Sequence, residues 1–326
     1  MTNKEIYKKT LTFSVGRFLF DILSFVILGG LSVGGFFLAK QFANNGLIGL
    51  IIGLVLGIIA VVIITRFVSY RYKAAQIAMM TRAVSEGSLP ENVKEEGFRI
   101  VKENFATVAI YYAVTRAIKG VFQQLGRLIT GAAEKIGGEN GNAVGSAIST
   151  VINTVVAYLC DCCLGWIFYR GCKNPFKSAC EGAVLFFRHG KTLAKNMGRV
   201  FGMGGFSLLA IGGAFTGVFY LIFSQFPSWF NTVAAQIASA DLKEGWIRDV
   251  LTNPNTLVIA AAVLAGVILW SILHSVLVKP FVLVGVLRNY IASGIQDTPT
   301  EASFAELASK SKKFAEMEQK AKADAI

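Results

Sequence analysis

The chain contains little charge for its length. Only 16% of its 326 residues are Asp, Glu, Lys or Arg, whereas 54% are apolar. An average soluble domain is about 25% charged and about 45–50% apolar. A departure in both directions is typical of integral membrane proteins, so we expect most of the chain to lie in or against a bilayer.

Histidine is also scarce, and cysteine is confined to one region. The chain has two His and five Cys, and all five Cys fall between Cys160 and Cys180. This clustering argues against the disulfide framework of a secreted domain. No His or second Cys pair stands at the spacing of a zinc site, and no Ser/His/Asp or Cys/His pattern suggests catalysis. We therefore predict no metal, no cofactor and no enzyme activity.

Acidic residues are outnumbered, which leaves a net charge of +12. A basic chain can bind nucleic acid, but here the basic residues do not form a patch on a soluble domain. In membrane proteins Lys and Arg accumulate in cytoplasmic segments instead. We expect the cytoplasmic face, including a basic amphipathic helix in 174–197, to contact anionic lipids.

Long apolar segments are the dominant feature of the chain. A helix needs about 20 apolar residues to span a bilayer. We predict an all-α, polytopic helical bundle over residues 1–300, followed by a charged cytoplasmic helix in 301–326. Six segments meet the requirement: 18–39, 47–68, 105–128, 144–169, 200–223 and 257–278. The least apolar of them, 105–128, could instead lie in the interface as an amphipathic helix.

The distribution of basic residues predicts the orientation. Lys and Arg concentrate in four segments: 1–17, 69–104, 170–199 and the tail after residue 278. The segments between them are poorer in Lys and Arg. The positive-inside rule then places both termini in the cytoplasm, with an even number of crossings. We expect the plasma membrane as the location.

Small residues at a spacing of four predict close helix packing. Gly49, Gly53 and Gly57 lie on one face of the second span, and Gly30 and Gly34 repeat the spacing in the first. Helices in lipid associate where small residues let their backbones approach. We expect a tight hairpin of the first two spans, because the turn between them is short. The alternative is a dimer face, which would make a homo-oligomer.

Charged residues inside the third and fourth predicted spans give the candidate site. Arg116 and Lys119 begin a polar stripe on 105–128, and Asp161 lies inside 144–169, with Asn153 two turns before it. At a rise of about 1.5 Å per residue, Arg116 and Asp161 would lie at roughly 16 Å and roughly 13 Å depth. Intramembrane charges usually face a bundle interior or a water-filled cavity. These four residues therefore predict a pathway for a small polar solute.

Two other interpretations of these charges stay open. The pair could satisfy two buried charges and do nothing more. Alternatively, if 105–128 is an interfacial helix, Arg116 faces lipid headgroups.

The C-terminal half resembles the end of the choline transporter-like family. The matching stretches are the Cys-rich 159–163 (LCDCC), the basic amphipathic 178–199 and the end of the last span at 277–289. The resemblance covers less than half of the chain. It implies transport of a solute or of a lipid precursor.

Two functions follow from these observations. The first is a small-solute transporter or channel that uses the polar site between the third and fourth spans. The second is a non-transporting membrane scaffold or partner-binding subunit that uses its cytoplasmic helices.

Overall fold

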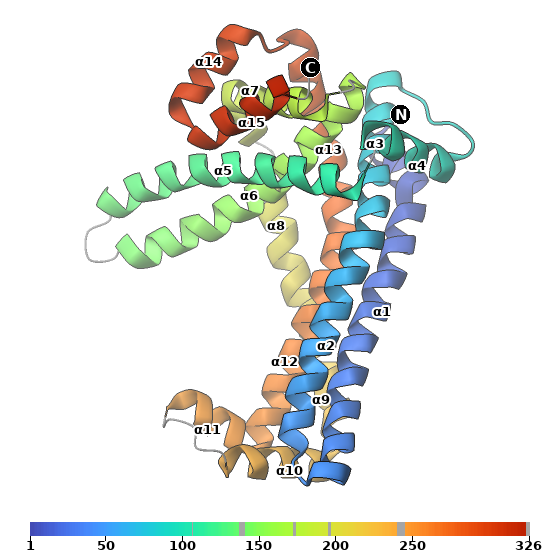
Figure 1. The fold of residues 1–326 in the computed structure, drawn as a ribbon, viewed down its shortest axis with the longest axis vertical. Coiled ribbons are helices and arrows are strands. Elements are labelled where there is room, and N and C mark those ends of the chain that lie inside the picture. Colours follow the sequence, from blue (N-terminus) through green and yellow to red (C-terminus); the bar gives the residue numbers. More distant parts are fainter. Residues whose placement is uncertain (106, 137–140, 172–173, 195–196, 240–244, 324–326) are drawn as a thin grey trace. The chain divides into compact units, whose positions relative to one another are not determined.

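The protein is an all-helical molecule in the computed structural model (Figure 1). The structure describes residues 1–105, 107–136, 141–171, 174–194, 197–239 and 245–323; within them, the side chains of 108, 125–136, 141–154, 190–194, 197–201, 246 and 247 are not described. These residues form no strand.

The α-helices are bounded as follows: α1 Asn3–Ala43, α2 Gly46–Ile64, α3 Tyr70–Glu86, α4 Val93–Asn104, α5 Val108–Ile136, α6 Gly141–Arg170, α7 Pro175–Ala194, α8 Met197–Ser207, α9 Gly213–Phe223, α10 Pro227–Ala238, α11 Trp246–Thr252, α12 Pro254–Leu273, α13 Lys279–Gln296, α14 Glu301–Lys310 and α15 Lys312–Ala323. Among the described residues, three π-helical segments interrupt them: η1 Thr65–Ser69, η3 Leu208–Gly212 and η4 His274–Val278.

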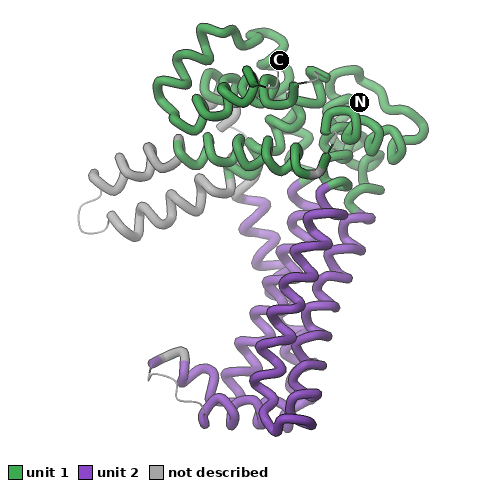
Figure 2. The backbone as a smooth tube through the Cα atoms, viewed as in Figure 1, with its two compact units in different colours: residues 1–14, 71–200, 280–326 green, residues 15–70, 201–279 purple. Residues whose placement is uncertain are grey.

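The chain folds into two compact units (Figure 2). Unit 1 comprises Met1–Ser14, Arg71–Val200 and Pro280–Ile326. Unit 2 comprises Val15–Tyr70 and Phe201–Lys279. The chain therefore enters unit 2 twice, and each time it leaves by a helix that runs on into unit 1.

Within the described ranges, four helices are long and apolar enough to cross a membrane: Asn3–Ala43, Gly46–Glu86, Gly202–Phe223 and Pro254–Gln296. They coincide with four of the six predicted spans. The other two, 105–128 and 144–169, fall on α5 and α6 in unit 1. In the described residues, α4 and α5 meet at a bend of 78° and would add a fifth span only if the bent pair crossed together.

Three of these helices are much longer than a bilayer requires. They contain 41, 41 and 43 residues, which corresponds to roughly 60 Å each, about twice the thickness of the hydrocarbon core. Each can therefore cross the membrane within unit 2 and still contribute a further stretch of helix to unit 1.

Glycines bring α1 and α2 into backbone contact within unit 2. A Cβ added at Gly49 would collide with the Gly35 carbonyl oxygen, and one at Gly53 would collide with that of Leu31. The α1 side of this seam differs from the prediction. A Cβ added at Gly30 or Gly34 would meet nothing within 4 Å, because these two glycines lie off the face that contains Leu31 and Gly35.

The two units differ in what their surfaces expose. Almost all large apolar side chains that are exposed in the described residues belong to unit 2. Those of unit 1 are only four: Tyr169, Phe187, Phe281 and Ile295. A surface as apolar as that of unit 2 requires lipid or another protein around it. Unit 1 instead has an apolar core and a mainly polar surface.

The core of unit 1 is built around the described half of α6, residues 155–170. The side chains of this helix are buried on every face from Tyr158 to Phe168. Close packing is visible at Gly294 of α13, where an added Cβ would meet the Trp166 ring. Helix α6 is therefore the central helix of a folded unit.

The C-terminal segment packs onto unit 1 as two helices, α14 and α15, and the single helix predicted for 301–326 is broken at Ser311. The Ser311 hydroxyl accepts from the Phe314 amide at 3.2 Å, which caps the start of α15. On α5, Gln124 Oε1 accepts from the Ser311 hydroxyl and from the Lys313 amide, both at 2.9 Å. These bonds tie the segment to α5.

Candidate functional site

Asp161 is buried in unit 1 and contacts a cation that the sequence did not indicate. Its carboxylate is 1% exposed, and Lys73 Nζ of α3 lies 2.6 Å from Asp161 Oδ1. The predicted partner was Arg116 of α5. The prediction that Asp161 needs a cationic partner is therefore met by a different residue from a helix far away in the sequence.

The remaining residues of the predicted site do not gather around Asp161. Helix α5 packs against α6 (Figure 1), and Val114 and Ile118 of α5 are fully buried. Arg116 and Lys119 lie on the opposite face of α5 and are exposed. Asn153 belongs to α6, but its side chain lies outside the described residues. The polar stripe on α5 thus forms part of the outer surface of unit 1.

A second buried carboxylate stabilises the end of α6. Glu181 of α7 is buried, and its Oε2 accepts from Trp166 Nε1 at 3.0 Å and lies 2.9 Å from Arg170 Nε. Both donors come from the last turns of α6, so Glu181 fixes α7 against that helix. The Trp and Arg that close the predicted fourth span are thus part of a buried α6–α7 contact.

In the described residues, Cys162, Cys163 and Cys180 are thiols buried in the core of unit 1. Cys163 and Cys180 are fully buried, and Cys163 Sγ lies 3.4 Å from the Tyr290 hydroxyl. Burial raises the pKa of the Cys180 thiol to about 12. A neutral, buried thiol is unreactive, so these cysteines act as small packing residues.

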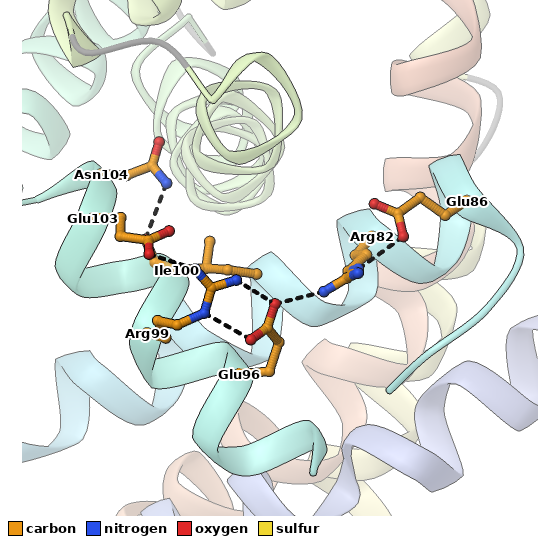
Figure 3. A network of polar contacts seen from close by, with 7 residues as sticks. All are labelled: Arg82, Glu86, Glu96, Arg99, Ile100, Glu103 and Asn104. Carbon is orange, nitrogen blue, oxygen red and sulfur yellow. Dashed lines mark hydrogen bonds and ion pairs between the residues drawn. The ribbon is translucent and has the colours of Figure 1, made fainter. Parts of the chain in front are cut away.

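An acid–base network joins α3 to α4 in unit 1 (Figure 3). Arg82 of α3 and Arg99 of α4 both bind Glu96, each with an N–O distance of 2.6 Å. Glu86 and Glu103 bind the far sides of the two arginines. Because every charge in it has an opposite partner, the network is best explained as a clamp between two helices.

Unit 2 holds a polar group of its own, which we call the neck cluster and define as Arg17, Asp21, Ser69 and Ser275. Arg17 Nε lies 3.5 Å from Asp21 Oδ2, and Ser69 donates to Asp21 Oδ1 at 3.0 Å. Arg17 also donates to the Ser275 carbonyl and hydroxyl, both at 3.3 Å. The cluster therefore links α1 to both η1 and η4.

A second polar group in unit 2 centres on Ser207. Its hydroxyl accepts from Trp270 Nε1 at 3.1 Å and lies 2.9 Å from the Gly204 carbonyl oxygen and 3.1 Å from His274 Nδ1. The hydroxyl has one proton and two acceptors within reach. When it donates to Gly204, His274 must supply the proton of its own bond to Ser207. The arrangement thus depends on whether the Nδ1 atom of His274 carries a proton.

The described π-helical segments all adjoin these polar groups. Ser69 ends η1, Ser207 precedes η3, and His274 and Ser275 begin η4. π-Helical turns often occur at functional sites, because they shift the register of a helix and free backbone groups. Their coincidence with the polar residues makes this end of unit 2 the strongest candidate site within the apolar helices.

The sequence contained a signal for part of this site. Arg17 and Asp21 are four residues apart and stand out in an apolar helix, whereas Ser69, Ser207 and Ser275 do not. Serines near span ends are common, and their partners come from other helices. Only the packing of the helices brings them to the charges.

Comparisons with known protein families, characterised proteins and solved structures give no match to this chain. The choline transporter-like resemblance stays a prediction. In the part of the chain that the structure describes, no group of three or more His, Cys, Asp or Glu could hold a metal ion.

Proposed function

We propose that the protein is a four-span integral membrane protein that works as an anchored, partner-binding subunit through unit 1. The proposal is supported mainly by the different surfaces of the two units: unit 2 exposes large apolar side chains, while unit 1 buries most of its own. Unit 2 matches a lipid-embedded anchor, and unit 1 matches a folded domain in water. Asp161, the centre of the expected conduit, belongs to the core of unit 1.

The charges support a cytoplasmic location for unit 1 and for both termini. Within unit 2 the basic residues are few: Arg17, Lys40, Arg66, Lys243, Arg248 and Lys279. Those in the connections between spans, Lys40, Lys243 and Arg248, are matched in number by Asp241, Glu244 and Asp249. The basic excess therefore belongs to the sequence of unit 1, as the positive-inside rule requires for cytoplasmic segments. The plasma membrane is the proposed location.

Arg116 and Lys119 then have a role different from the predicted one. On the exposed face of α5 they provide a basic surface for an acidic partner protein, since charge complementarity directs association. Such a partner would be held at the membrane by the anchor of unit 2.

Photocrosslinking in intact cells tests this proposal. A photoreactive amino acid replaces Arg116 or Lys119 in the full chain, and Leu264, which is 62% exposed in unit 2, serves as the lipid-facing control. We expect a discrete protein adduct from α5 and lipid adducts from position 264. Lipid adducts from both α5 positions would place that helix in the bilayer and overturn the proposal.

A second function is favoured by the neck cluster and by the group around Ser207. Arg, Asp and His within spanning helices often mark pathways for ions or polar solutes. We propose, as the alternative, that unit 2 moves a small polar solute along these residues. Uptake into proteoliposomes would then fall in Arg17→Gln and stay unchanged in Arg116→Gln. Equal uptake in both variants and in the original protein would remove this alternative.

A further inference from the structure

Two exposed cations and two aromatic rings form a cluster at the start of α3. Arg71 lies over the Phe98 ring, with its guanidinium carbon 5.7 Å from the ring centroid. Lys94 lies over the Tyr72 ring, with Nζ at 6.0 Å. The two rings meet edge to face with centroids 5.1 Å apart. We call these four residues the aromatic–cation cluster; all of them belong to unit 1.

The cluster has a firm base. Phe98 also packs edge to face on Phe13 of α1, which is 1% exposed, with centroids 5.8 Å apart. The rings are half-buried, whereas Arg71 and Lys94 are exposed. Both cations therefore sit on a fixed platform and can still reach a ligand. A cation at 6 Å from a ring is only weakly held by it.

In the part of the chain that the structure describes, neither cation has a carboxylate partner. Among the described residues, the ion pairs of α4 engage Glu96, Arg99 and Glu103. No described ion pair includes Arg71 or Lys94. The exposed acid next to Lys94 in the sequence is Glu95. The cluster thus presents two positive charges, each over one ring of the same aromatic pair.

The position of Arg71 along its helix indicates its depth relative to Arg66. It belongs to the continuous helix Gly46–Glu86, in which Arg66 is the first charged residue. Arg71 follows five residues later, or about 7 Å further along the axis. The headgroup layer on each side of the hydrocarbon core is about 5–7 Å thick. If the hydrocarbon ends near Arg66, the side chain of Arg71 lies at the level of the lipid phosphates.

We propose that the aromatic–cation cluster binds the headgroup of one anionic phospholipid. The Arg71 guanidinium and the Lys94 ammonium hold the phosphate, as paired basic groups do elsewhere. Tyr72 follows Arg71 in the chain and packs on Phe98, and aromatic side chains are favoured at the headgroup level. We assign the lipid to the cytoplasmic leaflet, and this assignment rests on the proposed cytoplasmic location of unit 1.

Lipid retention by the purified full-length protein tests the site. The protein is reconstituted in phosphatidylcholine with increasing phosphatidylglycerol, and the bound phosphatidylglycerol is counted by native mass spectrometry. We expect Arg71→Gln with Lys94→Gln to lower the apparent affinity roughly tenfold. The control, Lys102→Gln with Lys312→Gln, removes two exposed charges elsewhere on unit 1 and leaves retention unchanged.

Every other outcome overturns the proposal. Equal losses in the test and control pairs would mean that only total charge matters. Unchanged retention in the test pair would exclude the site, and competition by millimolar inorganic phosphate would show that it binds the free anion. Arg71→Lys keeps the charge and should retain the lipid, which guards against misfolding in the Gln variants. Retention does not depend on which leaflet is cytoplasmic, so it can succeed even if the proposed orientation fails.

Discussion

Lys73 and Asp161 form an ion pair between α3 and α6 with an Nζ–Oδ1 distance of 2.6 Å, and the two ends of the pair differ greatly in exposure. The lysine side chain is 30% exposed, whereas the carboxylate is 1% exposed. A buried charge without its partner is costly, while an exposed one can be solvated by water. Removing the lysine should therefore destabilise the protein more than removing the carboxylate.

This asymmetry predicts unequal effects of the two single substitutions. Lys73→Met takes this cation away from a buried carboxylate and should lower the free energy of unfolding by about 3 kcal/mol. Asp161→Asn leaves a neutral group in the core and a lysine that can turn to water, so the loss should be about 1 kcal/mol. Thermal unfolding of both variants in the same nanodiscs checks the order. A larger loss in Asp161→Asn would contradict it.

The predicted span 144–169 falls on α6, whose described side chains are surrounded by protein. From Tyr158 to Phe168 this helix is buried on every face, and a helix surrounded by protein needs the same apolar side chains as one surrounded by lipid. Composition could therefore identify the apolar helices but could not distinguish these two environments. The charge-free helix α2 differs from α6, because most of its large apolar side chains are exposed.

The candidate site was predictable only where its partners are close in sequence. Arg17 and Asp21 are one helical turn apart, and their pairing follows from helix geometry. The periodicity of α5 placed Arg116 and Lys119 on one face of the helix. It did not show whether that face contacts protein, lipid or water. Lys73 lies 88 positions before Asp161 in the chain, and no local pattern joins them.

The glycine seam predicts a steric effect with an internal control. Gly49→Ala adds a methyl group that collides with the Gly35 carbonyl, and overpacking of this kind costs about 1–3 kcal/mol. Gly30→Ala and Gly34→Ala add the same methyl group where nothing lies within 4 Å. We expect a lower unfolding temperature only for Gly49→Ala. Equal unfolding temperatures in all three variants would show that α1 and α2 do not pack in this way.

The clamp around Glu96 predicts a response to acid. Hydrogen bonds from Arg99, together with Arg82, lower the pKa of the Glu96 carboxyl from its usual 4.5. A lowered pKa in the folded state means that the clamp stabilises fully above about pH 4.5. That stabilisation is lost as the pH falls through the lower folded value.

Because Arg99 is largely exposed, the clamp should contribute only about 0.5 kcal/mol to the free energy of unfolding. Unfolding measured from pH 6 to pH 3 should be less pH-dependent in Glu96→Gln than in Glu91→Gln, which replaces an exposed loop carboxyl. Identical pH profiles would rule out the clamp as the source.

The Ser207 hydroxyl predicts a cost that is confined to unit 2. Ser207→Ala removes the acceptor for Trp270 Nε1 and the partner of His274 Nδ1, which should cost about 1–2 kcal/mol. Ser224→Ala removes a hydroxyl that donates only to a nearby carbonyl at an exposed position, and should be neutral. Thermal unfolding in nanodiscs compares the two variants. Equal stability would show that the two ring nitrogens find water instead.

The packing of α15 predicts when Cys180 can react. Phe314 and Met317 of α15 are buried, and the side chain of Asn174, the residue before α7, donates to the Ala321 carbonyl of α15 at 2.6 Å. Phe314→Asp puts a charge into this contact and should release α15, which exposes the Cys180 thiol and lets its pKa of about 12 fall towards the usual value. Maleimide labelling of Cys180 at pH 7, measured by peptide mass spectrometry, should then rise at least tenfold. Glu316→Gln changes a charge on the same helix outside the core and should leave labelling slow; fast labelling in the unchanged protein would mean that α15 does not cover this cysteine.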